Sequence, residues 1–430
     1  YNNQMLWSNK IPRAKNFTFK KYKIDTRRSI ISFYYKVEFQ NKKKRTYKDV
    51  LVLKGLKPDV WEKVPKLTLE TTLQALLLML GINYWQVFPT RDIRIDSFVL
   101  TKEQAQFWNT LYLNGLGEFF YDMQMNFRDL ISFPYSESAV APALAYIDLP
   151  ARTLLLNGAG KDSILSAEIL KESGVLFDFF SFAPTFAHKR IAKIVGAKTV
   201  EVDRKRDGRV EFIASLFGVS TAYPSVSTFT FIAVLISELL GYNSIIFSNE
   251  KSADFGNLTY RGLEVNHQWC KSSEAEKIIN EYIQKFITPS ISTSSLLRQY
   301  NEIEIVKRFV KYPKYLPYFT SCNNYFWLPW PIQLLFRKAY WCRNCPKCVF
   351  LFACFSAFLP KREVVQMFGG DLYAKKSLLP LFRRILGIEG FKPLDCVGEP
   401  NEMILAMRLA ISHGEYTNEP AVELFNKYFL

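Results

Sequence analysis

Residues 154–163 read LLLNGAGKDS, an apolar run that passes directly into a polar stretch with two glycines. Residues 153–157 are apolar enough for a buried strand, and residues 161–174 have the apolar period of an amphipathic helix that stops at a glycine. Small residues between a strand and a helix let the backbone approach an anion, and the first N–H groups of the helix point towards it. The stretch therefore predicts a phosphate-binding loop.

Two common phosphate loops do not fit this stretch. A Walker A loop has a glycine five positions before its second glycine and a hydroxyl residue after its lysine, whereas Leu155 and Asp162 occupy these positions here. A dinucleotide loop needs glycine or alanine where this sequence has Ser163. The remaining pattern is the pyrophosphate loop, Ser-Gly-Gly-x-Asp-Ser, and residues 158–163 keep its second glycine, its aspartate and its last serine.

The match to the pyrophosphate loop departs from the pattern at its start. Gly158 replaces the first serine, and Ala159 replaces the first glycine, which still permits close approach but restricts φ. Asn157 is expected to take over from the lost serine. Such loops hold the pyrophosphate that leaves when ATP is cleaved between its α- and β-phosphates, so ATP and adenylation chemistry are expected; a plain strand-to-helix turn is the alternative. The residues expected to bind the nucleotide are Asn157, Gly158, Ala159, Gly160, Lys161, Asp162 and Ser163.

The sequence divides into three parts with different patterns. Residues 1–148 begin with alternating apolar and basic positions, which predict antiparallel strands ahead of helices. Residues 149–271 alternate strands and helices, which predicts a parallel sheet covered by helices on both faces. Residues 272–430 have helical patterns and a cysteine cluster. We therefore expect an α/β fold: a parallel-sheet, adenine-nucleotide alpha-hydrolase-like core with a pyrophosphate loop, a β-rich N-terminal region and a helical C-terminal region.

Individual elements follow from the same periods. In the first part, strands are expected at 29–39 and 46–53, helices at 67–80 and 102–116, and a loop with a role in substrate binding at 115–130. In the middle part, further strands are expected at 175–182, 198–203 and from 243 onward, with a helix at 225–240. In the last part, helices are expected at 273–287, 302–311, 346–358, 371–386 and 400–412.

Composition restricts the environment and the partners. The chain has a formal net charge of +16, and its first sixty residues carry sixteen Lys and Arg against four Asp and Glu. The run Lys42–Arg45 is either part of a polyanion-binding surface or a solvated hairpin. Seven cysteines, partly clustered in a long chain, do not resemble a disulfide framework and favour the reducing cytoplasm. The longest apolar run, 349–359, is too short to span a bilayer, so no membrane is expected.

Five further motifs follow the loop in a fixed order. They are SNEKSADFGN (248–257), EVNHQWCKS (264–272), SCNN (321–324), WCRNCPKCVF (341–350) and KPLDCVGEPNE (392–402). Together with the loop they resemble the bacterial UDP-N-acetylmuramoyl-L-alanyl-L-glutamate epimerase family. The resemblance implies inversion of the terminal glutamate of UDP-MurNAc-L-Ala-L-Glu, with ATP and Mg²⁺ consumed through an acyl-adenylate to AMP and pyrophosphate, for peptidoglycan synthesis. It implies no specific nucleic-acid partner.

The same resemblance directs attention to a few acid–base residues. His267 lies in a matched motif, at a strand end where active sites of such sheets collect, and its ordinary pKa suits proton transfer at neutral pH. Glu250 is a candidate Mg²⁺ ligand or second base, and Lys251 a candidate for neutralising the transferring phosphate; a solvated acidic–basic pair is the alternative. Cys270 is a candidate second acid. The other histidines, His188 and His413, match no motif and are expected to be structural or superficial.

The cysteine cluster predicts a metal site. Four thiolates suit a closed tetrahedral zinc site, and the order resembles the zinc site of 7-cyano-7-deazaguanine synthase. Iron–sulfur ligation by three of them, or buried cysteines without metal, are the alternatives. The expected ligands are Cys322, Cys342, Cys345 and Cys348, while Cys354 and Cys396 are expected in the core.

Two other functions use the same features. An adenylating enzyme that modifies nucleosides or tRNA would use the loop, the cysteines and the basic N-terminal region. A nucleic-acid-binding protein with a degenerate nucleotide fold would use the basic region alone. Salt-sensitive RNA binding would distinguish both from the epimerase.

Overall fold

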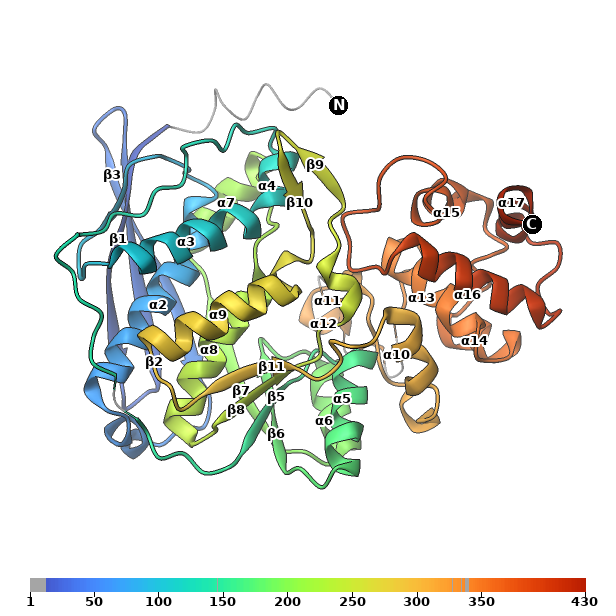
Figure 1. The fold of residues 1–430 in the computed structure, drawn as a ribbon, viewed down its shortest axis with the longest axis horizontal. Helices are drawn as coiled ribbons and strands as arrows, with labels where there is room; N and C mark the ends of the chain where they lie inside the picture. The colour runs from blue at the N-terminus through green and yellow to red at the C-terminus, as the bar shows by residue number, and fades with distance from the viewer. Residues whose placement is uncertain (1–12, 145, 327, 334, 337–339) are drawn as a thin grey trace. The chain divides into compact units, whose positions relative to one another are not determined.

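The computed structural model describes residues 13–144, 146–326, 328–333, 335–336 and 340–430 (Figure 1). Its larger sheet has nine strands in the order β11-β8-β5-β6-β7-β3-β2-β1-β4, and a smaller sheet pairs β10 with β9. The strands are β1 Ala14–Asp25, β2 Ile30–Phe39, β3 Lys44–Leu53, β4 Ile93–Ile95, β5 Thr153–Leu156, β6 Phe177–Phe182, β7 Thr199–Lys205, β8 Ser244–Phe247, β9 Leu258–Tyr260, β10 Leu263–Val265 and β11 Ser292–Ser295.

The N-terminal strands form an antiparallel meander, as the alternating pattern predicts. In β2 and β3, Val37 lies opposite Arg45 and Ile31 opposite Leu51, and β3 continues through an antiparallel pairing with β7. Apolar side chains alternate into the core on one face of each strand, which is the pattern that fixes a register. The basic run Lys42–Arg45 forms the exposed turn and the start of β3, which is compatible with a polyanion-binding surface and with a solvated hairpin.

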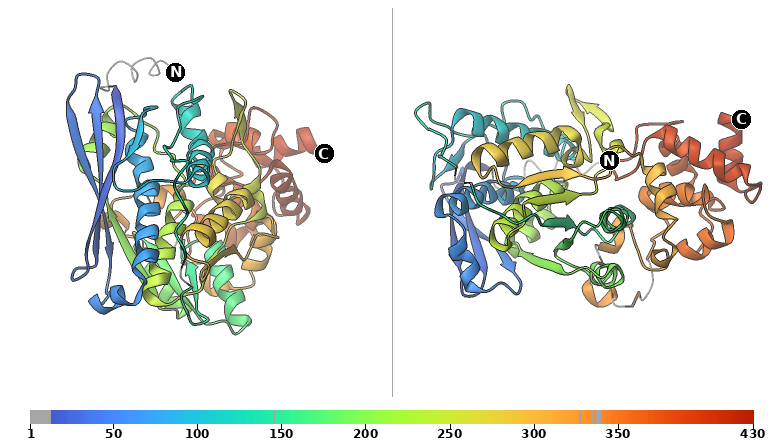
Figure 2. Two further views of the ribbon diagram at one scale, coloured as in Figure 1. Left: turned by 60° about the vertical axis from the view of Figure 1, so that its left-hand side comes forward. Right: turned by 60° about the horizontal axis from the view of Figure 1, so that its bottom comes forward.

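Helix α2 (Lys66–Trp85) packs closely on this meander, as the blue part of Figures 1 and 2 shows. The approach requires a glycine: a Cβ at Gly81 would lie 2.3 Å from the ring of Phe19 and 2.8 Å from that of Tyr35. Tyr35 also donates its hydroxyl to the carbonyl of Leu77, at 3.1 Å. The helix and strands are therefore locked together by shape and by a buried hydrogen bond.

The middle of the chain has the alternation that the sequence predicts. Strand β5, helix α5 (Lys161–Glu172), strand β6, helix α6 (Phe186–Val195) and strand β7 follow one another, and the three strands are neighbours in the sheet. Neighbouring strands joined by helices are the mark of parallel βαβ units. The coarse prediction of a mixed α/β fold with a helical C-terminal region is confirmed, while assignment to the pyrophosphate-loop class remains a prediction.

The other helices mostly agree with the sequence pattern, with three differences. A helix was expected at 371–386, and its first half is wrong. Only the 3₁₀ turn η5 (Lys376–Leu378) and helix α15 (Leu379–Ile385) form within this range, because Pro380 fits the first turn of α15 and interrupts a longer helix. Residues 115–130 were expected as a loop, but they contain helix α4. Helices α7, α11, α12, α14 and α17 were not predicted. The helices are α3 Lys102–Gly115, α4 Gly117–Asp122, α7 Gly208–Leu216, α8 Ser225–Leu240, α9 Ser273–Phe286, α10 Glu302–Phe309, α11 Asn323–Phe326, α12 Trp330–Gln333, α13 Pro346–Ser356, α14 Lys361–Phe368, α15 Leu379–Ile385, α16 Pro400–Ser412 and α17 Pro420–Phe429, with short 3₁₀ turns η1 Pro58–Lys63, η2 Lys251–Asp254, η3 Trp269–Lys271, η4 Pro313–Tyr315 and η5 Lys376–Leu378.

The chain forms two compact units, each assembled from separate segments. Unit 1 consists of residues 1–154, 201–245 and 259–294, and unit 2 of residues 155–200, 246–258 and 295–430. The three-part division at 148 and 271 remains a prediction about the sequence. Among the described helices, none combines the length and the apolar character needed to cross a bilayer.

Candidate active site

The loop between β5 and α5 is held by its own asparagine. Asn157 is buried, its Oδ1 accepts the backbone N–H of Ala159 at 2.9 Å, and its Nδ2 donates to the carbonyl of His188 at 3.2 Å. Ala159 adopts φ +56°, a left-handed conformation that costs a residue with a Cβ about 1–2 kcal/mol. This is where the pyrophosphate-loop pattern has glycine, so Asn157 stabilises a turn that the substituted alanine disfavours.

Gly160 ends the turn and begins helix α5. It is the N-cap, and it provides no side-chain hydrogen bond to the first turn of the helix. A Cβ at Gly160 would lie 2.9 Å from Oγ of Ser321, whereas one at Gly158 would meet nothing within 4 Å. The hydroxyl of Ser321 is itself buried and lacks a hydrogen-bond partner among the described residues. A narrow, donor-rich cradle of this kind fits a phosphate group.

The lysine of the loop is part of a buried charge network. Lys161 is fully buried and forms ion pairs with Asp162 and with Glu302, while Lys347 donates to the second oxygen of Glu302 at 2.8 Å. Burial opposes ionisation of Glu302, but the two ammonium groups outweigh it and lower the pKa of this carboxyl to about 2. Burial likewise opposes the charge on Lys161, yet Asp162 and Glu302 raise its pKa. The pKa of Lys347 is also raised, chiefly by Glu302, against the effect of burial, so both lysines and Glu302 are charged at neutral pH.

Two further candidates follow strand β8. Glu250 is buried, and its Oε1 has no hydrogen-bond partner among the described residues. Its neighbour Lys251 is exposed and begins η2, where its backbone N–H donates to the carbonyl of Tyr300 at 2.9 Å. The loop and these two residues belong to unit 2.

His267 belongs to unit 1, where it lies in the turn between β10 and η3. Its Nδ1 is 2.5 Å from Oε2 of Glu118, which helix α4 contributes. Burial raises the pKa of nearby Asp122, the last residue of α4, and the carboxylate of Glu118 adds to this effect. A carboxylate on one ring nitrogen fixes the orientation and the tautomer of a histidine and stabilises its protonated form. Cys270 follows in η3 and is partly exposed.

The four clustered cysteines meet in unit 2. Their Sγ atoms all lie within 4.8 Å of one another, and those of Cys342 and Cys348 are 3.7 Å apart. A tetrahedral zinc site with Zn–S distances of about 2.3 Å has sulfur–sulfur distances of about 3.8 Å, so the donor set fits zinc. The cluster joins two loops to the first turn of α13. The remaining members are Cys322 and Cys345.

Comparisons with known proteins identify the family of the chain. A protein-family model described as "MurL N-terminal domain" matches residues 8–296, and one described as "MurL C-terminal domain" matches residues 318–429. The chain belongs to the MurL family. A protein from Micromonospora sp. is 30% identical over 95% of this chain and 90% of its own length, and one from Salinispora tropica is 28% identical over 95% and 88%. A third, from Xanthomonas oryzae pv. oryzae, is 30% identical over 83% and 78%. All three are named UDP-N-acetyl-alpha-D-muramoyl-L-alanyl-L-glutamate epimerase.

One solved structure resembles part of this MurL-family chain. A predicted subunit of a tRNA methyltransferase from Methanocaldococcus jannaschii covers 37% of the chain and 74% of its own, with 18% identity and a TM-score of 0.25. A TM-score and a sequence identity this low indicate neither a shared fold nor a shared function.

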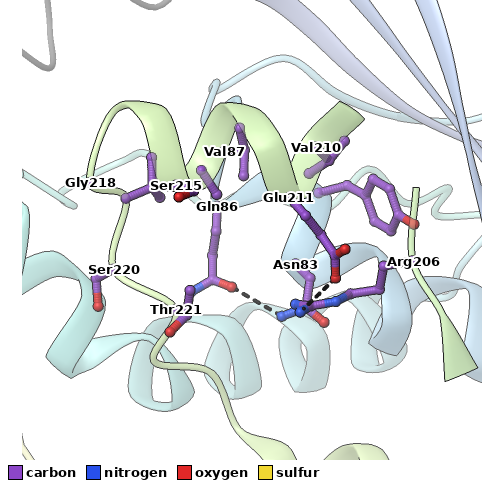
Figure 3. Close-up of a pocket in the computed structure, with 13 residues that line it drawn as sticks. Asn83, Gln86, Val87, Arg206, Val210, Glu211, Ser215, Gly218, Ser220 and Thr221 are labelled. Atoms are coloured by element: carbon purple, nitrogen blue, oxygen red, sulfur yellow. Dashed lines mark hydrogen bonds and ion pairs between the residues drawn. The ribbon is translucent and has the colours of Figure 1, made fainter. Parts of the chain in front are cut away.

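A cavity of about 310 Å³ lies within unit 1 and is lined by residues between positions 83 and 87 and between positions 206 and 221 (Figure 3). Figure 3 shows the amide of Asn83 beside Gln86, and Glu211 directed towards Arg206; the two contacts measure 3.3 and 2.9 Å. Val87, Val210, Ala214 and Val219 make much of the wall apolar. Ser220, another wall residue, donates its hydroxyl to Asp122 at 2.8 Å, which connects the cavity to the helix that carries Glu118.

The structure also shows where the histidines and cysteines lie for which no catalytic or metal-binding role was expected. His188 is buried, burial lowers its pKa to about 4, and its Nδ1 accepts the N–H of Thr185 at the start of α6, so its role is structural. His413 is exposed. Cys354 lies in the core as expected, but Cys396 is only partly buried, because it lies in the loop before α16 rather than on an inward helix face.

The sequence analysis of this MurL-family chain did not single out Glu118 in unit 1 or Glu302 and Lys347 in unit 2. Glu118 lies in a segment expected to be a loop, and Glu302 and Lys347 begin helices that were predicted only as packing elements. The signal available in the sequence was a charged residue in the first turn of a helix whose other residues are largely apolar. Lys347 in particular lies between two of the clustered cysteines.

Proposed function

We propose that this protein inverts the terminal L-glutamate of UDP-MurNAc-L-Ala-L-Glu to D-glutamate, using ATP and releasing AMP and pyrophosphate. The observation that carries the proposal is the pair of family matches, which extend from residue 8 to residue 429 with a single gap, together with relatives named for this epimerisation. The substrate belongs to peptidoglycan synthesis. ATP as co-substrate and seven free thiols favour a cytoplasmic location.

Chemistry gives a reason for the ATP. Removing a proton beside a carboxylate builds negative charge next to an existing negative charge, which makes the Cα–H of glutamate a very weak acid. Transfer of AMP to the α-carboxylate replaces the charged carboxylate beside Cα by the uncharged acyl group of an acyl-adenylate, and this acidifies the Cα–H. Removal of the proton from one face, its return to the other face and hydrolysis of the anhydride then complete an inversion.

The loop of residues 157–163 supports the ATP-cleaving half of this scheme. The uncapped first turn of α5 presents N–H groups where pyrophosphate would leave, and Gly160 keeps the space beside Ser321 open. Glu250, with a buried unpartnered oxygen, and Asp162 are the candidate ligands for the Mg²⁺ that accompanies the phosphates. Lys251 remains the candidate for neutralising the phosphate under transfer, although its exposure makes that role conditional on bound nucleotide.

The pairing of His267 with Glu118 supports the proton-transfer half. A general base must accept a proton and hold it briefly, and the carboxylate at Nδ1 favours that protonated state. Cys270, three residues later, is the candidate for protonating the opposite face. The four-cysteine cluster would hold Zn²⁺ as a closed structural site, where the metal contributes to folding and not to the reaction.

One incubation tests the proposal. The protein is mixed with ATP, Mg²⁺ and UDP-MurNAc-L-Ala-L-Glu, and the glutamate is hydrolysed out and its configuration determined, while AMP is quantified in parallel. We expect D-glutamate and AMP to appear in equal amounts. AMP without D-glutamate would mean another acceptor for the adenylate, and D-glutamate without AMP would mean a direct racemase.

A further inference from the structure

Ionisable side chains are concentrated around the loop in unit 2, in spite of the cost of burying them. Lys161 and Glu302 are essentially inaccessible, and Lys347 is 5% exposed. Removing such charges from water costs several kcal/mol per ion, and a buried ion pair contributes little stability compared with apolar residues of the same volume. The neighbouring apolar core of unit 2 could accommodate such residues, so stability alone does not account for the network.

We propose that Lys347 is a second phosphate-binding cation of the loop site and that Glu302 positions it together with Lys161. The inference rests on the proposed function, in which the loop holds the pyrophosphate of ATP. Glu302 is the first residue of α10, and one oxygen contacts each lysine, so it holds both ammonium groups beside the start of α5.

The charges of the network define the ligand more closely. Asp162, Glu250 and Glu302 contribute three carboxylates, whereas Lys161 and Lys347 contribute two ammonium groups. Both lysines therefore already contact carboxylates before a ligand binds, and a bare polyanion would have to compete with Asp162 and Glu302 for them. A divalent cation that arrives with the pyrophosphate lowers the negative charge of the ligand by two and supplies a partner for Oε1 of Glu250. The expected ligand is thus magnesium pyrophosphate and not free pyrophosphate.

The position of Lys347 also connects the site to the cysteine cluster. Lys347 lies between Cys345 and Cys348, in the first turn of α13. The gathering of the four thiols therefore also fixes the backbone that carries its ammonium group. Residues Cys345 and Cys348 are part of a set whose sulfurs are already gathered. We therefore expect loss of the cluster to weaken pyrophosphate binding as well as stability.

Calorimetric titration of the nucleotide-free protein with pyrophosphate, with and without Mg²⁺, tests the inference. Lys347→Met should weaken magnesium pyrophosphate binding at least about tenfold, because a charge-assisted contact is lost. Lys347→Arg, which keeps the charge, should recover most of the affinity. Lys307→Met, which removes an exposed lysine of α10, is the matched control and should bind like the wild type.

The outcomes separate a binding role from a structural role. A Lys347→Met protein that melts earlier but binds magnesium pyrophosphate like the wild type would overturn the inference, since Lys347 would then only support the fold. Equal weakening in Lys347→Met and Lys347→Arg would overturn it too, because charge would not be the property that matters. Failure of the wild type itself to bind magnesium pyrophosphate would instead contradict the proposed use of ATP.

Discussion

Nδ1 of His267 lies 2.5 Å from Oε2 of Glu118, although 149 positions separate the two residues in the chain. If this pair transfers the Cα proton after adenylation, exchange must require ATP cleavage. In D₂O we expect deuterium at the glutamate Cα only with ATP and Mg²⁺, and none with a non-cleavable α,β-methylene analogue. Glu118→Gln and His267→Asn should both still form AMP but lose at least about 100-fold in Cα exchange, the usual size of an acid–base contribution.

Other results would reassign the pair. Exchange without ATP would indicate a direct racemase. Loss of AMP formation in His267→Asn would move His267 to substrate or nucleotide binding. Unchanged epimerisation by His267→Asn would direct the search for the base to Glu250 or Cys270.

The phosphate loop has a steric requirement at Gly160. The added Cβ would press on Ser321 and the branched side chain would occupy the phosphate cradle, so Gly160→Val should abolish AMP formation. Asp162→Ala should do the same by removing a Mg²⁺ ligand and a partner of Lys161. AMP production is measured beside circular dichroism spectra. Unchanged AMP release by either folded variant would refute the nucleotide assignment.

Much of the fold follows from local patterns in the sequence. The alternation in β2 and β3, and the apolar periods of α2, α5 and α8, depend on neighbours within a few residues, so they can be recognised without a structure. The helix expected over 371–375 does not form, and α17 was missed although its apolar residues Ala421, Val422, Leu424 and Phe425 recur at helical spacing. Strand order cannot be read in this way, because β3 (Lys44–Leu53) pairs with β7 (Thr199–Lys205), a strand that lies far away in the sequence.

The site could be predicted only where its residues share a motif. The loop 157–163 and the four cysteines were found because backbone and metal chemistry require characteristic spacings. Glu118 and Glu302 are single acidic residues in ordinary helices, and their roles depend on partners brought near by folding. Even Lys347, only 45 positions from Glu302, has no spacing rule that indicates their pairing.

Metal analysis should find about one zinc per chain, because the four sulfurs already have suitable separations. Cys345→Ser should lower the zinc content and the melting temperature, since a structural metal contributes directly to folding. Cys270→Ser, which changes a cysteine outside the cluster, is the control and should keep the metal. Iron–sulfur absorbance in anaerobic material, or full zinc content after the Cys345 substitution, would contradict the assignment.

Stability should fall with rising pH because of Glu238. This carboxyl on α8 is buried and accepts the hydroxyl of Thr72 at 2.6 Å, and burial raises its pKa from 4.5 to about 8. The folded state then binds a proton that the unfolded state releases between these values, so the free energy of unfolding decreases from pH 5 to pH 8 by about 3 kcal/mol from this group alone.

Glu238→Gln removes that proton linkage and keeps the shape. Its free energy of unfolding, from denaturant titrations at several pH values, should exceed that of the wild type progressively as pH rises towards 8. Glu281→Gln, at an exposed position of α9, should leave the wild-type pH dependence unchanged. Parallel curves for wild type and Glu238→Gln would show that Glu238 is ionised in the folded state.

The cavity of Figure 3 provides the last prediction. A substrate as large as UDP-MurNAc-L-Ala-L-Glu must occupy space beyond the reacting glutamate, and the hydrogen bond from Ser220 to Asp122 connects this cavity to the helix that carries Glu118. Ala214→Leu fills the cavity with methyl groups and leaves its polar residues in place. We expect KM for the UDP-linked substrate to rise about tenfold with little change in kcat, as for loss of uniform binding.

The matched control is Phe212→Ser, which changes a 66% exposed residue of the same helix α7 and should leave KM unaltered. Melting temperatures of both variants establish that the helix is intact, because a leucine that enters open space should not destabilise the fold. An unchanged KM in a folded Ala214→Leu variant would exclude the cavity from substrate binding. A fall in kcat with constant KM would instead mean that the side chain displaces α4, and through it Glu118, from the geometry that orients His267.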